Sequence, residues 1–299
     1  MSRVGTCSWA DESFVKAYYP KGVDRLAYYA ERFDTVEANS TYYRLPDREL
    51  VAGWAAKLPE GFVMHVKAFG LMTRHPVKVE VLPPELQELM PVDERGRVDR
   101  PSREARAEVF RYFLDALEPL RTAGKLGGIL MQMAPYVVPK EASYDYLEWA
   151  RDQLDGYEML VEFRHKAWFE EPEEPLRFLE EHGMTFVIVD APVFPLVVGR
   201  TSPTAYLRLH GRNAETWHKR TGSTAERFDY LYSGDELEEV ARTVRGLEAD
   251  GAETVYAMFN NNGRSTVAEV PKNLLGETEA EVVAQAPTNA AMLKELLAA

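Results

Sequence analysis

The sequence contains hardly any cysteine and no long hydrophobic run. Cys7 is the one cysteine among 299 residues, so no disulfide can form within the chain. Residues 1–6 lead straight into a strand-like segment and lack the apolar core of a secretion signal. Together these features predict a reducing compartment, the cytoplasm. No apolar run approaches the roughly 20 residues of a membrane-spanning helix, so we expect no membrane partner.

Positive charge and histidine are also scarce. The chain has 35 Lys and Arg against 48 Asp and Glu, a formal net charge of -13, and 6 histidines. An acidic surface disfavours nucleic acid and anionic membranes as partners, although it leaves room for a small basic pocket. Histidine pairs at metal-binding spacing, glycine-rich phosphate loops and a Gly-x-Ser-x-Gly nucleophile motif are all absent. The sequence therefore requires no metal and no other cofactor, and it leaves the oligomeric state open.

The chain does contain enough apolar sequence to bury a core, since 45% of it is hydrophobic and 28% is charged. Eight strand-like segments alternate with helical patterns along it. The predicted strands are residues 4–9, 35–40, 62–67, 128–133, 159–163, 185–190, 205–210 and 254–260. The predicted helices are residues 24–33, 48–57, 102–123, 175–182, 236–250 and 289–297.

This alternation of strand and helix predicts a single (β/α)₈ barrel domain, a TIM barrel, over residues 1–299. A doubly wound open sheet is the alternative, and the missing Gly-x-Gly-x-x-Gly motif after the first strand weighs against it. Two polar stretches that contain proline, residues 74–104 and 263–288, are predicted to be insertions. Each follows a strand, so each is either a lid over the mouth of the barrel or a surface excursion.

Pairs of polar residues close five of the predicted strands. Residues two apart in a strand point to the same face, so each of these strands sends two polar groups to one side at its carboxyl end. The pairs are Glu37 and Asn39, His65 and Lys67, Glu162 and Arg164, Arg208 and His210, and Asn260 and Asn262. We expect them to form one polar cluster at the C-terminal mouth of the barrel, where enzymes of this fold keep their sites.

Several of these side chains suit proton transfer. Two buried carboxylates, Glu37 and Glu162, can act as acid and base when their surroundings differ. Lys67 can neutralise a carboxylate, act as a base or form a Schiff base. His210 carries an imidazole, the side chain that ordinarily titrates near neutral pH. The predicted catalytic residues are Glu37, Lys67, Glu162, Asp190 and His210.

Other residues suit ligand binding, because guanidinium forks match carboxylate or phosphate and aromatic rings stack on a sugar or a base. The predicted ligand-binding residues are Asn39, Gln132, Arg164, Arg208, Arg212, Asn260, Trp9 and Tyr42. Two alternatives remain open. The charged groups could form a closed ion-pair network that only organises the core. A hard cation could also be held by Glu37, Glu162 and Asp190, although the nearby lysine and arginines would oppose it.

Several stretches of the chain match motifs of a known family. They are Gly5-Thr6-Cys7-Ser8-Trp9, Tyr19-Pro20-Lys21-Gly22, Thr35-Val36-Glu37-Ala38-Asn39-Ser40-Thr41-Tyr42-Tyr43, Glu162-Phe163-Arg164-His165, Leu209-His210-Gly211-Arg212 and Phe259-Asn260-Asn261. With them the chain resembles, over nearly its whole length, the domain-of-unknown-function 72 (YecE-like) family. The resemblance implies a TIM barrel and gives no reaction. Cys7-Ser8 and Ala134-Pro135 depart from the usual family pattern, and the two insertions are longer than is typical.

Three functions are compatible with these observations. The first is an enzyme of hydrolase, lyase or isomerase type that uses general acid and base groups on a small anionic or sugar-like metabolite at the barrel mouth. The second is a metal-dependent phosphodiesterase acting on nucleic acid, by analogy with xylose-isomerase-like barrels that include endonucleases. The net charge of -13 and the lack of histidine ligands count against it. The third is a ligand-binding protein without catalysis.

Overall fold

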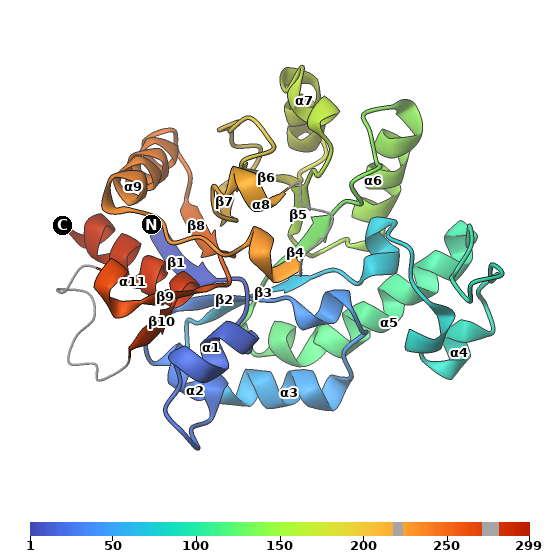
Figure 1. Cartoon of the computed structure of the whole chain (residues 1–299). Helices are drawn as coiled ribbons and strands as arrows, with labels where there is room; N and C mark the ends of the chain where they lie inside the picture. Colours follow the sequence, from blue (N-terminus) through green and yellow to red (C-terminus); the bar gives the residue numbers. More distant parts are fainter. Residues whose placement is uncertain (218–223, 271–280) are drawn as a thin grey trace. The chain divides into compact units, whose positions relative to one another are not determined.

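The computed structural model describes residues 1–217, 224–270 and 281–299. Its eight long strands run parallel and form a closed barrel in the order β1 to β8 (Figure 1). The strands are β1 (Ser2–Thr6), β2 (Thr35–Ala38), β3 (Val63–Lys67), β4 (Leu126–Gln132), β5 (Met159–Glu162), β6 (Thr185–Asp190), β7 (Thr204–Leu209) and β8 (Thr254–Phe259). With helices between the strands, this architecture confirms the predicted TIM barrel.

The strands end close to where the sequence predicts. β6 has the predicted bounds, and all six of its residues are buried, as expected for a strand covered on both faces. β1 is shorter than predicted because the Thr6 hydroxyl donates to the carbonyl of Ser8 at 2.6 Å and the Ser8 hydroxyl accepts from the amide of Ala10 at 3.0 Å. These bonds favour a turn in residues 8–10 in place of further extended strand.

The helices begin at recognisable caps. Asp47 accepts from the amide of Leu50 at the start of α3, and Ser233 forms a capping box with Glu236 at the start of α9. The helices are α1 (Glu12–Ala17), α2 (Arg25–Ala30), α3 (Arg48–Lys57), α4 (Pro84–Gln87), α5 (Arg103–Thr122), α6 (Glu141–Gln153), α7 (Glu173–Glu181), α8 (Ala214–Trp217), α9 (Gly234–Ala249) and α11 (Gln285–Ala298). Within these ranges, no helix combines the length and the apolar character needed to cross a bilayer.

Two compact units make up the chain. The terminal unit consists of Met1–Glu37 and Thr185–Ala299, and the central unit consists of Ala38–Met184. In the terminal unit, α11 packs against β1 and α9 (Figure 1), while β8 pairs with β1 and β7. In the central unit, β4 pairs with β3 and β5, and α5 packs against α3.

The two predicted insertions have structure of their own. Residues 74–104 contain the short helix η3 (Val79–Val81), α4 and two isolated β-bridges, Lys78 to Arg97 and Val92 to Val98. Residues 263–288 contain an antiparallel pair, β9 (Arg264–Thr266) and β10 (Val282–Ala284), and the start of α11. Residues 271–280 of this second stretch lie outside the described residues. That either stretch acts as a lid stays a prediction.

Candidate functional site

A buried ion pair joins the carboxyl ends of β2 and β7 in the terminal unit. The Arg208 Nη2 lies 2.7 Å from Glu37 Oε1, and its Nε donates to Oε2 at 3.0 Å. The hydroxyl of Tyr206 donates to the same Oε2 at 2.9 Å. Glu37 is 0% exposed and Arg208 is 1% exposed. Both carboxylate oxygens are therefore hydrogen-bonded to protein groups. Buried charges are tolerated when they are paired and hydrogen-bonded in this way.

His210 extends this pair toward β8. Its Nε2 lies 3.5 Å from Arg208 Nη1, and its Nδ1 lies 2.9 Å from the side-chain amide of Asn260. A guanidinium can only donate, so Nε2 accepts and a neutral imidazole then carries its proton on Nδ1. The Asn260 atom 2.9 Å from Nδ1 is the amide nitrogen Nδ2, so this tautomer requires the amide to be turned over, with its oxygen facing Nδ1. The rings of Trp217 and Phe228 lie 6.3 and 5.8 Å from the imidazole and leave His210 1% exposed.

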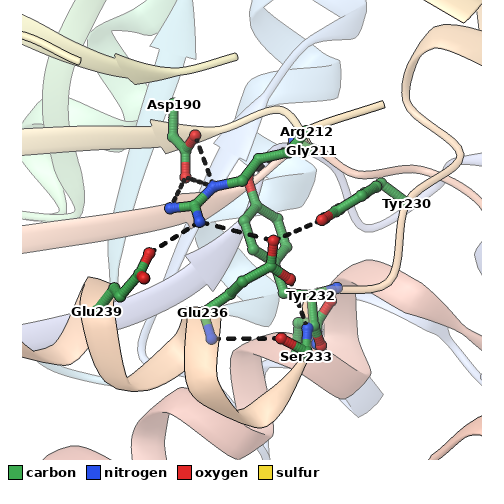
Figure 2. A network of polar contacts seen from close by, with 9 residues as sticks. Asp190, Gly211, Arg212, Tyr230, Tyr232, Ser233, Glu236 and Glu239 are labelled. Carbon is green, nitrogen blue, oxygen red and sulfur yellow. Dashed lines mark hydrogen bonds and ion pairs between the residues drawn. The ribbon is translucent and has the colours of Figure 1, made fainter. Parts of the chain in front are cut away.

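Asp190 belongs to a second cluster of the terminal unit, shown in Figure 2. Arg212 places Nη2 3.0 Å from Asp190 Oδ2 and Nη1 2.9 Å from Glu239 Oε2. Asp190 and Arg212 line a cavity of about 50 Å³ together with Leu207, Leu209, Ile188 and Val240. Arg208 alternates with Leu207 and Leu209 along β7, so the cavity lies on the opposite face of this strand from the Glu37 pair.

The second cluster ties the turn after β7 to the start of α9 (Figure 2). Gly211, with φ +90°, donates its amide to the hydroxyl of Tyr232 at 2.9 Å, and the Tyr230 hydroxyl donates to Glu236 Oε1 at 2.5 Å. Burial raises the pKa of the Asp190 carboxyl, and the Arg212 guanidinium only partly offsets this. The cluster thus anchors the segment that follows His210, and its acidic groups surround the guanidinium.

In the central unit, polar side chains stand at the ends of β3, β4 and β5. Arg164 Nη1 lies 2.8 Å from Glu162 Oε1, so this predicted pair is in direct contact. Glu162 is fully buried and neighbours Gln132 across the β4–β5 ladder. Lys67 places its Nζ 4.4 Å from the centre of the Tyr42 ring, a cation–π distance. Lys67, Gln132 and Arg164 are all partly exposed.

His75 joins this group, although it does not stand at a strand end. The hydroxyl of Thr73 donates to the carbonyl of Gly70 and lies 2.8 Å from His75 Nδ1, so in the tautomer that keeps both bonds Nδ1–H donates a hydrogen bond to the hydroxyl oxygen. The ring then carries an unprotonated Nε2. Burial, with help from the charges of Lys67 and Arg164, lowers the pKa of His75 from 6.5 to about 4. His75 is therefore a neutral imidazole at pH 7.

The remaining predicted residues have other surroundings. Asn39 precedes the short helix η1 (Ser40–Tyr42) and has φ -91° and ψ -20°, so it is no longer in the extended conformation. The expectation that residues two apart point to the same face of a strand therefore does not apply to Asn39. Trp9 is partly exposed, and its carbonyl accepts from the Tyr19 hydroxyl at 2.6 Å. His65 is buried, with Nδ1 accepting from the amide of Gly128 at 2.9 Å.

The structure thus brings together Glu37, Arg208, His210 and Asn260 in one group, and Asp190 with Arg212 in another. In the central unit it brings together Glu162 with Arg164, and Lys67 with Tyr42. That all of these residues share one cavity stays a prediction. Among residues 1–217, 224–270 and 281–299, no three His, Cys, Asp or Glu side chains are grouped so that they could hold a metal ion.

Comparisons with known proteins give a family and a fold. Residues 3–292 match the family described as "Protein of unknown function DUF72". A DUF72 family protein of Thermotoga maritima MSB8 is 30% identical with a TM-score of 0.73, and the alignment covers 100% of both chains. A DUF72 family protein of Enterococcus faecalis V583 is 24% identical with a TM-score of 0.76, covering 100% of this chain and 96% of that one.

A fungal β-1,4-galactanase structure has a TM-score of 0.53 at 8% identity, covering 98% of this chain and 99% of the galactanase, and this likeness shows the fold alone. No curated protein sequence matches the chain. The family match spans nearly the whole chain, and the motifs around Glu37, Glu162 and His210 lie inside it. The chain belongs to the DUF72 family of proteins of unknown function.

Proposed function

We propose that the protein is an enzyme that moves protons on a small anionic or sugar-like metabolite at the carboxyl ends of the barrel strands. In TIM barrels this end of the strands carries the catalytic groups. The observation that carries the proposal is the open polar group of the central unit, in which Lys67, His75 and Arg164 are all partly exposed. Fully buried groups such as Glu37 and Arg208 lack this access.

The charges of this group favour an anion. Lys67 and Arg164 are cations near His75, and Glu162 is the carboxylate that contacts Arg164 at 2.8 Å. Lys67 and Arg164 bring two positive charges to this group, although the chain as a whole has a net charge of -13. Guanidinium and ammonium groups in a site with little water attract a carboxylate or phosphate of the metabolite strongly.

His75 is the group we assign to proton transfer. Its Nδ1 proton is held by Thr73, so Nε2 presents a lone pair that can accept a proton from the metabolite. Burial is the main cause of the lowered pKa of His75, and the charges of Lys67 and Arg164 lower it further. A bound anion would offset the part due to these charges, raise the pKa of His75 toward its ordinary range and make it a stronger base. The metabolite thus activates the base that acts on it.

The other predicted catalytic residues take supporting roles in this proposal. Glu162 orients Arg164 and balances part of its charge. Glu37 and Asp190 hold Arg208 and Arg212. His210, which is 1% exposed, lies between Arg208 and Asn260 and supports them from within the buried group. The reaction uses protein side chains in each of these roles.

Turnover of a panel of phosphorylated and carboxylated sugars and acids tests the proposal. Once a substrate is found, His75→Gln should lower kcat by on the order of 10²-fold or more, as expected for loss of a general base. Lys67→Gln should mainly raise KM, because it removes ground-state attraction for the anion. His182→Gln is the matched control, since His182 bonds the carbonyl of Phe178 at the end of α7.

Two outcomes would count against the proposal. Saturable binding of panel compounds without turnover would favour the ligand-binding alternative. Full turnover by the His75→Gln variant would remove His75 from the mechanism.

A further inference from the structure

Three arginines of the central unit gather on two adjacent aromatic rings. The guanidinium carbons of Arg74 and Arg106 lie 5.2 and 5.5 Å from the centre of the Tyr146 ring. The guanidinium carbon of Arg103 lies 5.8 Å from the Trp149 ring, and the two ring centres are 5.5 Å apart. We call these three residues the arginine cluster. Arg74 follows β3 and its short helix η2 (Gly70–Thr73), and the other two stand in the first turns of α5.

The Tyr146 ring beneath the arginine cluster is buried and hydrogen-bonded. Tyr146 is 7% exposed, and its hydroxyl donates to the carbonyl of Met72 at 2.5 Å. Arg106 Nη1 donates to the carbonyl of Leu71, which ties α5 to η2. The three guanidinium groups are therefore held by rings and backbone, and not by carboxylates.

The arginine cluster has little negative charge in direct contact with it. In the described parts of the chain, none of the three arginines forms an ion pair, whereas Arg111 on the same helix pairs with Glu108 at 2.6 Å. Two of the three stand at the N-terminal end of α5, where the helix dipole disfavours cations. The neighbouring carboxylate of Glu104 is hydrogen-bonded to Ser102 and attracts Arg103 without forming an ion pair with it. An anion bound here would relieve the repulsion among the three guanidinium groups.

The backbone of Arg74 also supports a binding role. Its φ of +67° lies in the left-handed region, which ordinarily favours glycine or asparagine. The hydroxyl of Tyr136 donates to the Arg74 carbonyl, and the Tyr136 ring is 60% exposed. Arginine in this conformation is a strained choice for a turn, and such strain is found mainly where a side chain must be held in place for function.

We propose that Arg74, Arg103 and Arg106 form a binding site for a phosphate group of the ligand. Guanidinium forks suit the tetrahedral oxygens of phosphate, and three positive charges match a dianion better than a single carboxylate. Arg74 and His75 are consecutive residues, so the phosphate site and the base of the proposed reaction share one segment. This inference rests on the proposed function for the identity of the ligand, which becomes a phosphorylated metabolite. The binding itself can be measured without any turnover.

Calorimetry with pyrophosphate at low ionic strength tests the site. The double variant Arg74→Asn, Arg103→Gln removes two charges, keeps a residue that tolerates the left-handed conformation and spares the Arg106 bond to Leu71. We expect about tenfold or weaker binding in this variant, because it loses charge-assisted hydrogen bonds. Arg111→Gln, the matched control on α5, should bind as the unaltered protein does. Equal affinity in the double variant, or no saturable binding by the unaltered protein, would overturn the inference.

Two further ligands distinguish where the phosphate comes from. A sugar phosphate that binds and loses affinity in the double variant identifies a metabolite as its source. If a short single-stranded oligonucleotide binds more tightly than the sugar phosphate, with strong salt dependence, the source of the phosphate is nucleic acid. The arginine site would then stand, and the assignment to a metabolite would be overturned. Pyrophosphate binding that depends on the arginine cluster, combined with no turnover of any panel compound, would remove the proposed reaction and leave the site standing.

Discussion

The buried pair of Glu37 and Arg208 gives the most quantitative prediction. Both side chains are excluded from water, and the two carboxylate oxygens of Glu37 accept three hydrogen bonds. Glu37→Gln keeps the shape of the side chain but removes the negative charge that lies 2.7 Å from the buried Arg208 guanidinium. Breaking a buried pair in this way typically costs ~3–5 kcal/mol. At roughly 2–4 °C per kcal/mol for a chain of this size, Tm should fall by on the order of 6–20 °C.

Thermal and urea unfolding measure this loss, and two further variants show its cause. Glu108→Gln breaks the ion pair with Arg111, whose side chain is 70% exposed, and should cost at most about 1 kcal/mol. Glu37→Gln combined with Arg208→Met should recover part of the lost stability, because it removes both charges of the buried pair. Equal Tm values for Glu37→Gln and Glu108→Gln would refute the buried-pair reasoning.

Two other predictions concern stability. The pKa of His75 is about 4 in the folded protein, and its ordinary value is 6.5. Between pH 4 and 6.5 the unfolded chain therefore binds more protons than the folded one. The free energy of unfolding should consequently fall as the pH drops from 6.5 to 4. Urea titrations should show this loss reduced in His75→Gln, and an identical pH profile in both proteins would contradict it. Tyr232→Phe should cost about 1–3 kcal/mol in urea unfolding, because the amide of Gly211 loses its buried acceptor. Tyr157→Phe, which loses an exposed bond to Arg121, is its control and should cost much less.

Most of the barrel could be predicted from the sequence. Buried parallel strands appear in it as short apolar runs, and polar residues follow at the carboxyl end of one strand after another. The helix α6 was not predicted. Its buried face consists of Ser143, Tyr146, Leu147 and Ala150, which is too polar and too small to stand out as an apolar stripe. Its N-cap, Lys140, makes no side-chain capping bond, so the usual start signal is missing as well.

The candidate site could be predicted only in part. The spacing of two residues pointed to the contacts of Glu162 with Arg164 and of Arg208 with His210, because each pair stands at or just beyond the end of a strand. It could not tell which face of β6 carries Asp190, since that depends on the register within the barrel. It could not find His75 either, which is brought to Lys67 and Arg164 by the turn after β3.

The pKa of His75 with and without bound anion tests the central claim most directly. Proton NMR of the imidazole, identified by the signal that His75→Gln removes, follows its titration at low ionic strength. We expect a pKa of about 4 in the free protein, rising toward 6.5 when inorganic phosphate saturates the site beside Lys67 and Arg164. A pKa near 6.5 in the free protein, or no change at saturating phosphate, would contradict the claim that an anion binds there and activates this base.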